Sequence, residues 1–214
     1  MIANNTKRPD ALFIGDNKAL DFLNTIAQPS KIKYDWLSNG QDLFNWLIQI
    51  KHVSIEDIEH FKQNHYLQEI DNIASEVRTL REWFRRFIIK HTNETTHLFT
   101  NTDIKYVNDI LEQDHSYTQI ENIRDSQGRY YSKRLKRRFQ APQDLLLPIA
   151  ESIADLICNK DFNQIKKCQN SKCTIWFLDS TKNHSRNWCS MSICGNRAKA
   201  AQYRLKKKLA KIQI

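Results

Sequence analysis

Residues 168–199 read CQNSKCTIWFLDSTKNHSRNWCSMSICGNRAK and contain four of the chain's five cysteines. The four form two pairs of equal spacing, Cys168-x4-Cys173 and Cys189-x4-Cys194, with fifteen residues between the pairs. Two close cysteine pairs with a hairpin-sized spacer are typical of a tetrahedral thiolate site for a metal. We predict that these four thiolates hold one structural Zn²⁺, with iron as the alternative that four thiolates also accept.

Other interpretations of the cysteines stay open at this stage. Unpaired buried thiols or a redox pair would also place cysteines close together, although disulfides are disfavoured in a cytosolic chain. His184 lies five residues before Cys189 and is a rival ligand. Because four cysteines complete a tetrahedron, we expect His184 at the surface or facing a phosphate. Cys158 stands outside the symmetry, and we expect it to be a small buried hydrophobe at a helix end.

The sequence around the cysteines predicts a small zinc-binding module. Residues 175–179 and 186–189 carry aromatic side chains on either side of a polar loop and predict a β-hairpin. The segment Gly195–Ile212 predicts a helix with an apolar stripe at spacings of 3, 4, 4 and 3. A knuckle, a hairpin and a helix that carries the last ligand form a treble-clef zinc finger. A module of this size needs the metal to fold, because it buries little apolar surface by itself.

The charge of the chain is concentrated at its C-terminal end. The formal net charge is +9, and no Asp or Glu follows Asp179. Such asymmetry predicts a polyanion-binding end on a neutral body, with a solvated basic tail as the alternative. The candidate nucleic-acid contacts are Arg186, Asn196, Arg197, Lys199, Arg204, Lys206, Lys207, Lys208 and Lys211.

Three classes of binding function fit this module, and enzymatic activity does not. A basic helix suits the phosphate backbone of duplex DNA, which makes a DNA-binding regulator the first hypothesis. An RNA-binding or ribosome-associated finger is the alternative, in which aromatic residues either stack on bases or form the finger's own core; these are Trp176, Phe177, Trp188 and Tyr203. A protein-interaction finger is the third. We expect no enzyme, because four cysteines leave no open position on the metal.

The same residues resemble a known family. Cys168-x4-Cys173, Trp176-x-Leu178-Asp179, Arg186-Asn187-Trp188-Cys189 and Cys194-Gly195-Asn196-Arg197-x-Lys199 resemble the CGNR zinc finger family. That family usually carries an N-terminal ABATE domain, and four stretches here resemble it in the expected order: GDNKALDFLNT (15–25), DLFNWL (42–47), VRTLREWFRRF (77–87) and PQDLLLPIAESIADLI (142–157). The resemblance implies stress-induced transcription regulation, zinc on the four cysteines and DNA contact from the finger helix.

The N-terminal body predicts an α+β fold in which helices dominate. The expected helices are Lys18–Ala27, Asn39–Ile50, Ser54–Asn64, Tyr66–Thr92, Thr102–Gln113 and Ala141–Asn159. A turn signal at 125–128 between two strand-like runs predicts a β-hairpin before the last helix. We therefore divide the chain into an ABATE-like domain at 1–162 and a CGNR finger with a basic helix at 163–214.

Two further groups of polar residues need an explanation. Asp21, Asn24 and Thr25 lie among apolar residues and form either a small-ligand pocket or an internal hydrogen-bond network with Arg81 or Arg85, the second being favoured. Residues 133–138 form a second basic cluster, which fits a solvated hairpin edge or an extension of the nucleic-acid contact surface.

The remaining expectations concern partners and location. Dimerisation suits a regulator, because one short finger reads few base pairs, but no heptad pattern indicates it. No signal peptide and no run of about 18 apolar residues are found. We therefore expect a soluble, cytoplasmic protein with no membrane contact, associated with the nucleoid if it binds DNA.

Overall fold

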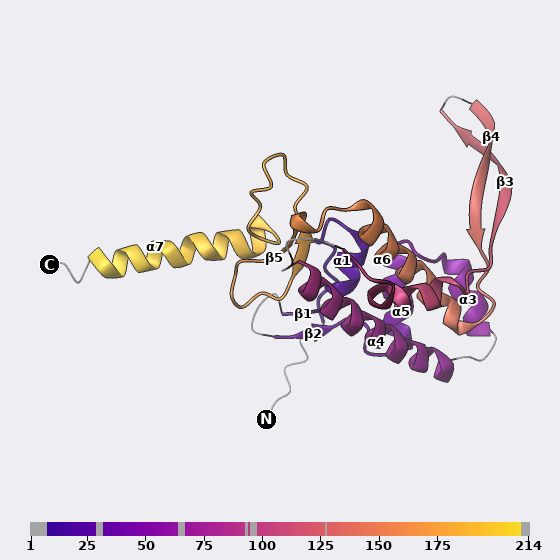
Figure 1. Cartoon of the computed structure of the whole chain (residues 1–214), viewed down its shortest axis with the longest axis horizontal. Helices are drawn as coiled ribbons and strands as arrows, with labels where there is room; N and C mark the ends of the chain where they lie inside the picture. Colours follow the sequence, from indigo (N-terminus) through magenta and orange to yellow (C-terminus); the bar gives the residue numbers. More distant parts are fainter. Residues whose placement is uncertain are drawn as a thin grey trace.

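The computed structural model describes residues 8–28, 32–63, 67–92, 94, 98–126 and 128–210. A helical body carries two projections, a β-ribbon and a C-terminal helix, which extend from opposite ends of its long axis (Figure 1). The helices of the body are α1 (Lys18–Leu23), α2 (Gly40–Gln49), α3 (Ile55–Gln63), α4 (Leu67–His91), α5 (Asn101–Leu111) and α6 (Leu147–Asn159), the last preceded by the 3₁₀ turn η1 (Pro142–Leu146). The predicted helix-rich α+β fold is confirmed.

Polar side chains define where these helices begin. The side chain of Asn17 accepts a hydrogen bond from the backbone N–H of Ala19, 2.9 Å away, and Asn39 caps α2 in the same way. Thr100 and Asp103 form a capping box at the start of α5. Such caps pair N–H groups that have no partner within the helix. The predicted helices therefore begin close to where the sequence places them.

The first predicted helix is shorter than expected. It ends at Leu23 rather than Ala27, because Ile26–Ala27 forms β1 and pairs antiparallel with β2 (Tyr34–Asp35). The helix predicted to begin at Tyr66 is described from Leu67, and it runs without a break through 25 residues of α4. Residues 64–66, where two predicted helix ends fall, lie outside the described residues.

Two strands form the sheet of the finger, and one of them differs from the prediction. Strand β6 (Trp176–Leu178) pairs antiparallel with β5 (Ile165–Lys167), so the hairpin encloses the first cysteine pair. The predicted pairing of 175–179 with 186–189 is wrong. Residues 186–189 form no strand, because their backbone is held by other contacts: Arg186 N–H donates to Asp179, and Asn187 C=O accepts from Gln169 N–H.

Strand β6 lies between two apolar cores. Trp176 and Leu178 pack into the core of the helical body, and Phe177 packs into a second core around the four cysteines. Successive side chains of a strand point to opposite faces, which lets three residues serve both cores. The 3₁₀ turn η2 (Phe162–Gln164) and β5 also place Phe162 and Ile165 in the body core. The boundary between residues 162 and 163 stays a prediction.

The β-ribbon and the C-terminal helix extend away from these cores (Figure 1). Strands β3 (Ser116–Asp125) and β4 (Gly128–Arg137) pair antiparallel along their full length, which confirms the predicted hairpin. Gly128 has φ +125°, a conformation that favours glycine. The π-helical turn η3 (Met191–Gly195) leads directly into α7 (Asn196–Ala210). Among the described helices, none has the length and apolar character needed to cross a membrane.

Candidate metal centre and nucleic-acid interface

The four predicted ligands meet at one point. The sulfur atoms of Cys168, Cys173, Cys189 and Cys194 all lie within 4.8 Å of one another, and all four residues are buried. The Sγ atoms of Cys173 and Cys189 are 3.8 Å apart, which is too far for a disulfide. A tetrahedron with Zn–S bonds of about 2.3 Å separates its sulfurs by about 3.8 Å. The geometry of the cluster therefore fits one zinc ion.

The electrostatics of the cluster also call for a cation. The hydrogen bond between Cys189 and Cys173 raises the pKa of Cys189, and burial and the neighbouring thiolates raise it further. Burial raises the pKa of Cys194 to about 11. The hydrogen bond from Cys189 lowers the pKa of Cys173 to about 6. Four thiolates therefore share this site only with a positive ion among them, and the site holds one structural zinc.

Backbone hydrogen bonds hold the ligands in place. In the knuckle between β5 and β6, Cys173 N–H donates to Asn170 C=O over 2.8 Å and Cys168 N–H donates to Ile175 C=O over 2.9 Å. The side-chain amide of Asn170 lies 3.4 Å from Cys194 Sγ and donates to it. Cys194 belongs to η3, so the zinc site fixes the point from which α7 begins.

The loop between the cysteine pairs is organised by Asp179. Its carboxylate accepts from Lys166 Nζ at 2.6 Å, from Thr181 Oγ1 at 2.5 Å and from Arg186 N–H at 2.9 Å. Burial raises the pKa of Asp179, but these hydrogen bonds outweigh it and hold the pKa below its ordinary value. Asp179 is therefore a buried anion that shapes the loop.

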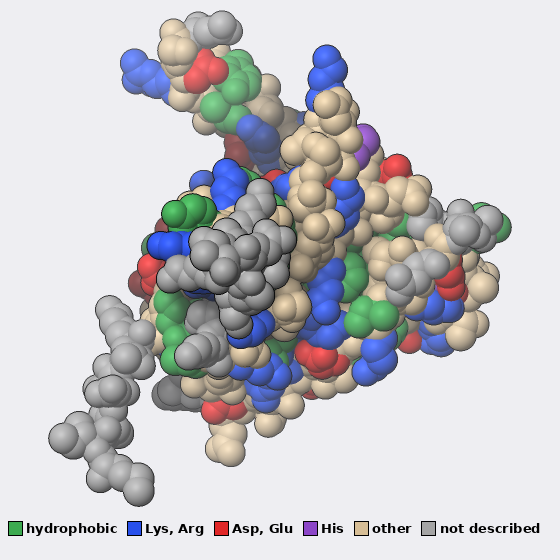
Figure 2. Space-filling model, turned by 90° about the vertical axis from the view of Figure 1, so that its left-hand side faces the viewer, with side chains coloured by type: hydrophobic (Ala, Val, Ile, Leu, Met, Phe, Trp, Pro, Cys, Tyr) green, Lys and Arg blue, Asp and Glu red, His purple; other side chains and the backbone are tan. Residues whose placement is uncertain are grey.

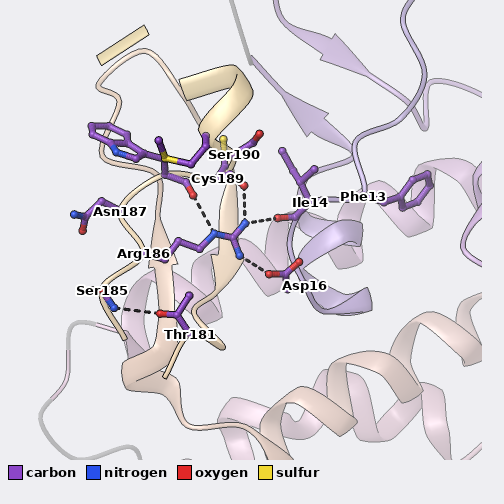
Figure 3. A pocket seen from close by; sticks show the side chains of 11 residues that line it. Phe13, Ile14, Asp16, Thr181, Ser185, Arg186, Asn187, Cys189 and Ser190 are labelled. Atoms are coloured by element: carbon purple, nitrogen blue, oxygen red, sulfur yellow. Dashed lines mark hydrogen bonds and ion pairs between the residues drawn. The ribbon is translucent and has the colours of Figure 1, made fainter. Parts of the chain in front are cut away.

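Arg186 was predicted to contact nucleic acid, and the structure gives it another role. Its guanidinium donates to the backbone C=O of Trp188, Cys189 and Ile14, and pairs with Asp16 (Figure 3). The guanidinium also lies over the ring of Phe177, 4.2 Å from its centroid. Its side chain is only 19% exposed. Arg186 joins the finger to the N-terminal segment, so we remove it from the nucleic-acid contacts.

The polar residues of the stretch GDNKALDFLNT (15–25) also join the finger to the body. The side-chain amide of Asn24 donates to Trp176 C=O over 2.8 Å and accepts from Trp176 N–H over 2.9 Å, so it pairs with β6. Asp21 accepts from Gly15 N–H over 2.8 Å, and Gly15 C=O in turn accepts from Leu178 N–H. Burial raises the pKa of Asp21 to about 6. These groups make internal contacts.

Arg81 and Arg85 complete this set of contacts from α4. Arg81 is buried and forms two parallel hydrogen bonds to the Asp35 carboxylate, at 2.9 and 2.8 Å, and a third to Thr25 Oγ1. Arg85 donates to Leu23 C=O over 2.8 Å. Burial raises the pKa of Asp35, but the hydrogen bonds and charge of Arg81 outweigh it and lower the pKa. Helix α4 thus holds the end of α1 and strand β2 together.

Helix α7, which carries most of the predicted contacts, extends away from the helical body (Figure 1). Asn196, Arg197, Lys199, Arg204 and Lys207 are all exposed. The side chains of Lys206 and Lys208 and the whole of Lys211 lie outside the described residues, as does the predicted end of the helix. Figure 2 shows the molecule from the end where α7 projects. Lys and Arg side chains are spread over the surface seen in this view.

A cleft of about 500 Å³ separates the zinc knuckle from the first turns of α7. Its lining includes Asn170 and Lys172 from the knuckle, Arg197 and Arg204 from α7, and Trp188. The three cations converge on one hollow, and Lys172 was not among the predicted contacts. The signal that would have identified Lys172 is its position between Cys168 and Cys173, in the knuckle that borders the cleft with α7.

Two known families match this chain. The CGNR zinc finger family matches residues 164–207. The ABATE family, described as "Putative stress-induced transcription regulator", matches residues 16–160. The chain belongs to the ABATE family and carries a CGNR zinc finger. Among curated proteins, no match was found.

The structure gives Asp16 and Asn170 roles that the sequence did not predict, and it identifies the partners of Asn24 and Asp179, which belong to the predicted motifs. Asp16 and Asn24 of the ABATE domain bind the finger directly, and Asp179 and Asn170 organise the finger from within. Cys158 lies at the end of α6 as predicted, but the predicted burial is wrong, because its side chain is exposed. His184 is also exposed and lies outside the cysteine cluster.

Proposed function

We propose that this protein is a zinc-dependent DNA-binding transcription regulator in which the CGNR finger presents α7 to duplex DNA. The observation that carries the proposal is the position of Cys194. Only Gly195 lies between this zinc ligand and the first residue of α7. Metal binding therefore orients a helix whose described charged side chains are all basic. A fixed cationic helix suits a phosphate backbone. The description of the ABATE family as a regulator supports the same function.

The cleft beside α7 supplies a place for the backbone of the nucleic acid. Lys172, Arg197 and Arg204 border it, and Asn170 adds an amide. One guanidinium group donates two parallel hydrogen bonds to the oxygens of a phosphate. The same two donors fit O6 and N7 of guanine in the major groove. We therefore assign Arg197 and Arg204 to phosphate or guanine contact, and Asn196, Lys199 and Lys207 to supporting contacts along the helix.

Duplex DNA is preferred over single-stranded RNA because of where the aromatic residues lie. Trp176 and Phe177 are buried in the two cores and unable to stack on bases, and Trp188 is half-buried against the cysteine cluster. Only Tyr203, among the four aromatic candidates, is largely exposed, at 69%. Single-stranded recognition relies on several stacking platforms. RNA binding remains the alternative outcome of the experiment below.

The experiment measures binding of fluorescent duplex DNA to the full chain over a series of salt concentrations. We expect tight binding at low salt and a log–log slope of about −0.9 for each phosphate neutralised. The double variant Arg197→Ala/Arg204→Ala should bind more weakly, with a slope reduced by about 1–2 units, and keep one zinc per chain. Competition with structured RNA of equal length distinguishes the two nucleic acids.

A matched control removes the same charge from the body. Lys62 and Arg86 are exposed residues of α3 and α4, so Lys62→Ala/Arg86→Ala should bind as the wild type does. Equal binding by both double variants would reject the assignment of α7. Stronger competition by RNA than by duplex DNA would replace DNA with RNA as the partner.

A further inference from the structure

The β3–β4 ribbon is the second projection of the molecule, and the proposed function leaves it without a role. Each strand has ten residues, so the ribbon is about 34 Å long. It projects from the end of the body opposite to α7 (Figure 1). A two-stranded sheet in water is marginally stable at best. Its extension away from the body indicates that a partner covers one of its faces.

The strand register divides the ribbon into two different faces. Directly paired residues point to the same side, and successive pairs alternate between sides. Beyond the half-buried Ser116–Arg137 pair at its base, one face of the ribbon, which we call the open face, consists of the pairs Thr118–Leu135, Ile120–Lys133, Asn122–Tyr131 and Arg124–Arg129. All eight of these residues are exposed. The open face is therefore free along its whole length in the described structure.

The open face combines positive charge with exposed apolar groups. It carries three cations, Arg124, Arg129 and Lys133, and no acidic residue. Both acidic residues of the ribbon, Glu121 and Asp125, belong to the other face. On that other face Lys136 pairs with Glu121 at 2.6 Å, and Arg138, just beyond the strand, stacks on Tyr117, 4.7 Å from the ring centroid. On the side of the open face, Arg137 at the base of the ribbon pairs with Asp114 and Glu151, whereas the three cations farther out share their face with no acidic residue.

Three large apolar side chains alternate with the cations of the open face. Ile120 is 73% exposed, Tyr131 76% and Leu135 68%. Exposed apolar groups on a projecting element mark an interaction surface. The surrounding charge selects the partner, because an acid-free basic face attracts a polyanion and repels a second copy of itself.

We propose that the open face of the β3–β4 ribbon binds duplex DNA. The major groove of B-DNA, about 12 Å wide, admits a two-stranded β-ribbon. In that position the three cations contact phosphates, Asn122 faces base edges, and the apolar side chains contact thymine methyl groups or sugars. This surface is separate from α7 and does not require the finger to bind DNA.

The decisive experiment places a photo-crosslinking benzophenone amino acid at Tyr131 in the full chain. We expect crosslinks to radiolabelled duplex DNA, and the exposed position 105 of α5 serves as the control that gives none. Crosslinks from position 131 to protein instead of DNA would overturn the proposal and identify an acidic protein surface or a second copy as the partner. Absence of any crosslink to DNA would also overturn it.

A charge experiment tests the same surface by affinity. The triple variant Arg124→Ala/Arg129→Ala/Lys133→Ala is made in the background Arg197→Ala/Arg204→Ala. The log–log dependence of affinity on salt should become shallower by about 0.9 for each phosphate that is no longer neutralised. The matched control Lys62→Ala/Arg86→Ala/Lys160→Ala removes the same charge from exposed positions of the body. Equal slopes for the two triple variants would overturn the proposal. Because the α7 double variant is measured by itself, and the ribbon and control triple variants are compared in that same background, failure of one assignment is distinguishable from failure of the other.

Discussion

Replacing Asn24 by alanine tests whether the ABATE domain and the CGNR finger fold as one unit. The Asn24 amide is 1% exposed and forms two hydrogen bonds with the backbone of Trp176, which lies 152 residues away in the sequence. Truncation leaves a buried N–H and a buried C=O without this partner. Each unpaired buried group costs about 1–3 kcal/mol, so the free energy of unfolding should fall by about 2–6 kcal/mol.

The effect is measurable by thermal unfolding. For a chain of this size a loss of about 3 kcal/mol lowers Tm by roughly 6–12 °C. Hydrogen exchange should also accelerate at the amide of Trp176. The control Asn108→Ala removes an exposed asparagine from α5 and should leave Tm within about 2 °C. An Asn24→Ala protein with wild-type Tm and unchanged protection at Trp176 would refute the reasoning.

Three further predictions concern zinc, pH and the two basic projections. Cys173→Ser should lose the bound zinc, measured by metal analysis, and should lose duplex binding through α7 while the far-UV circular dichroism of the helical body persists; retained zinc would contradict the four-sulfur site. The pKa of Asp21 is about 6 in the folded state, which is above its value in the unfolded chain. Ionisation of Asp21 therefore destabilises the native state. The stability that protonated Asp21 contributes at low pH is lost as pH rises from about 4 to 6. The stability of Asp21→Asn relative to the wild type should therefore rise by about 3 kcal/mol over that range in urea unfolding, and a difference that does not vary with pH would contradict the raised pKa. Finally, monomeric wild-type protein should link a bead-bound duplex to a second labelled duplex, whereas the ribbon triple variant and the α7 double variant should each bind one duplex without linking two; linking by both variants would show that the projections are not the two contacts.

The cysteine spacing, the helix positions and the charge asymmetry could all be predicted from the sequence. Each depends on residues near one another in the chain. Cys168 and Cys173 share a knuckle because a tight turn brings positions five apart together, and the caps at Asn39 and Thr100 act within three residues. Local geometry of this kind is encoded directly in spacing and residue type.

The roles of Arg186 and Asn24, the partner of β6 and the isolation of the β-ribbon were decided by the tertiary structure. Arg186 pairs with Asp16, 170 residues earlier, and Asn24 pairs with Trp176 across a similar distance. A basic residue beside a zinc ligand looks the same in sequence whether it faces solvent or a carboxylate. Which of the two holds depends on how the finger packs on the body, because burial and hydrogen-bond partners are set by residues remote in the chain.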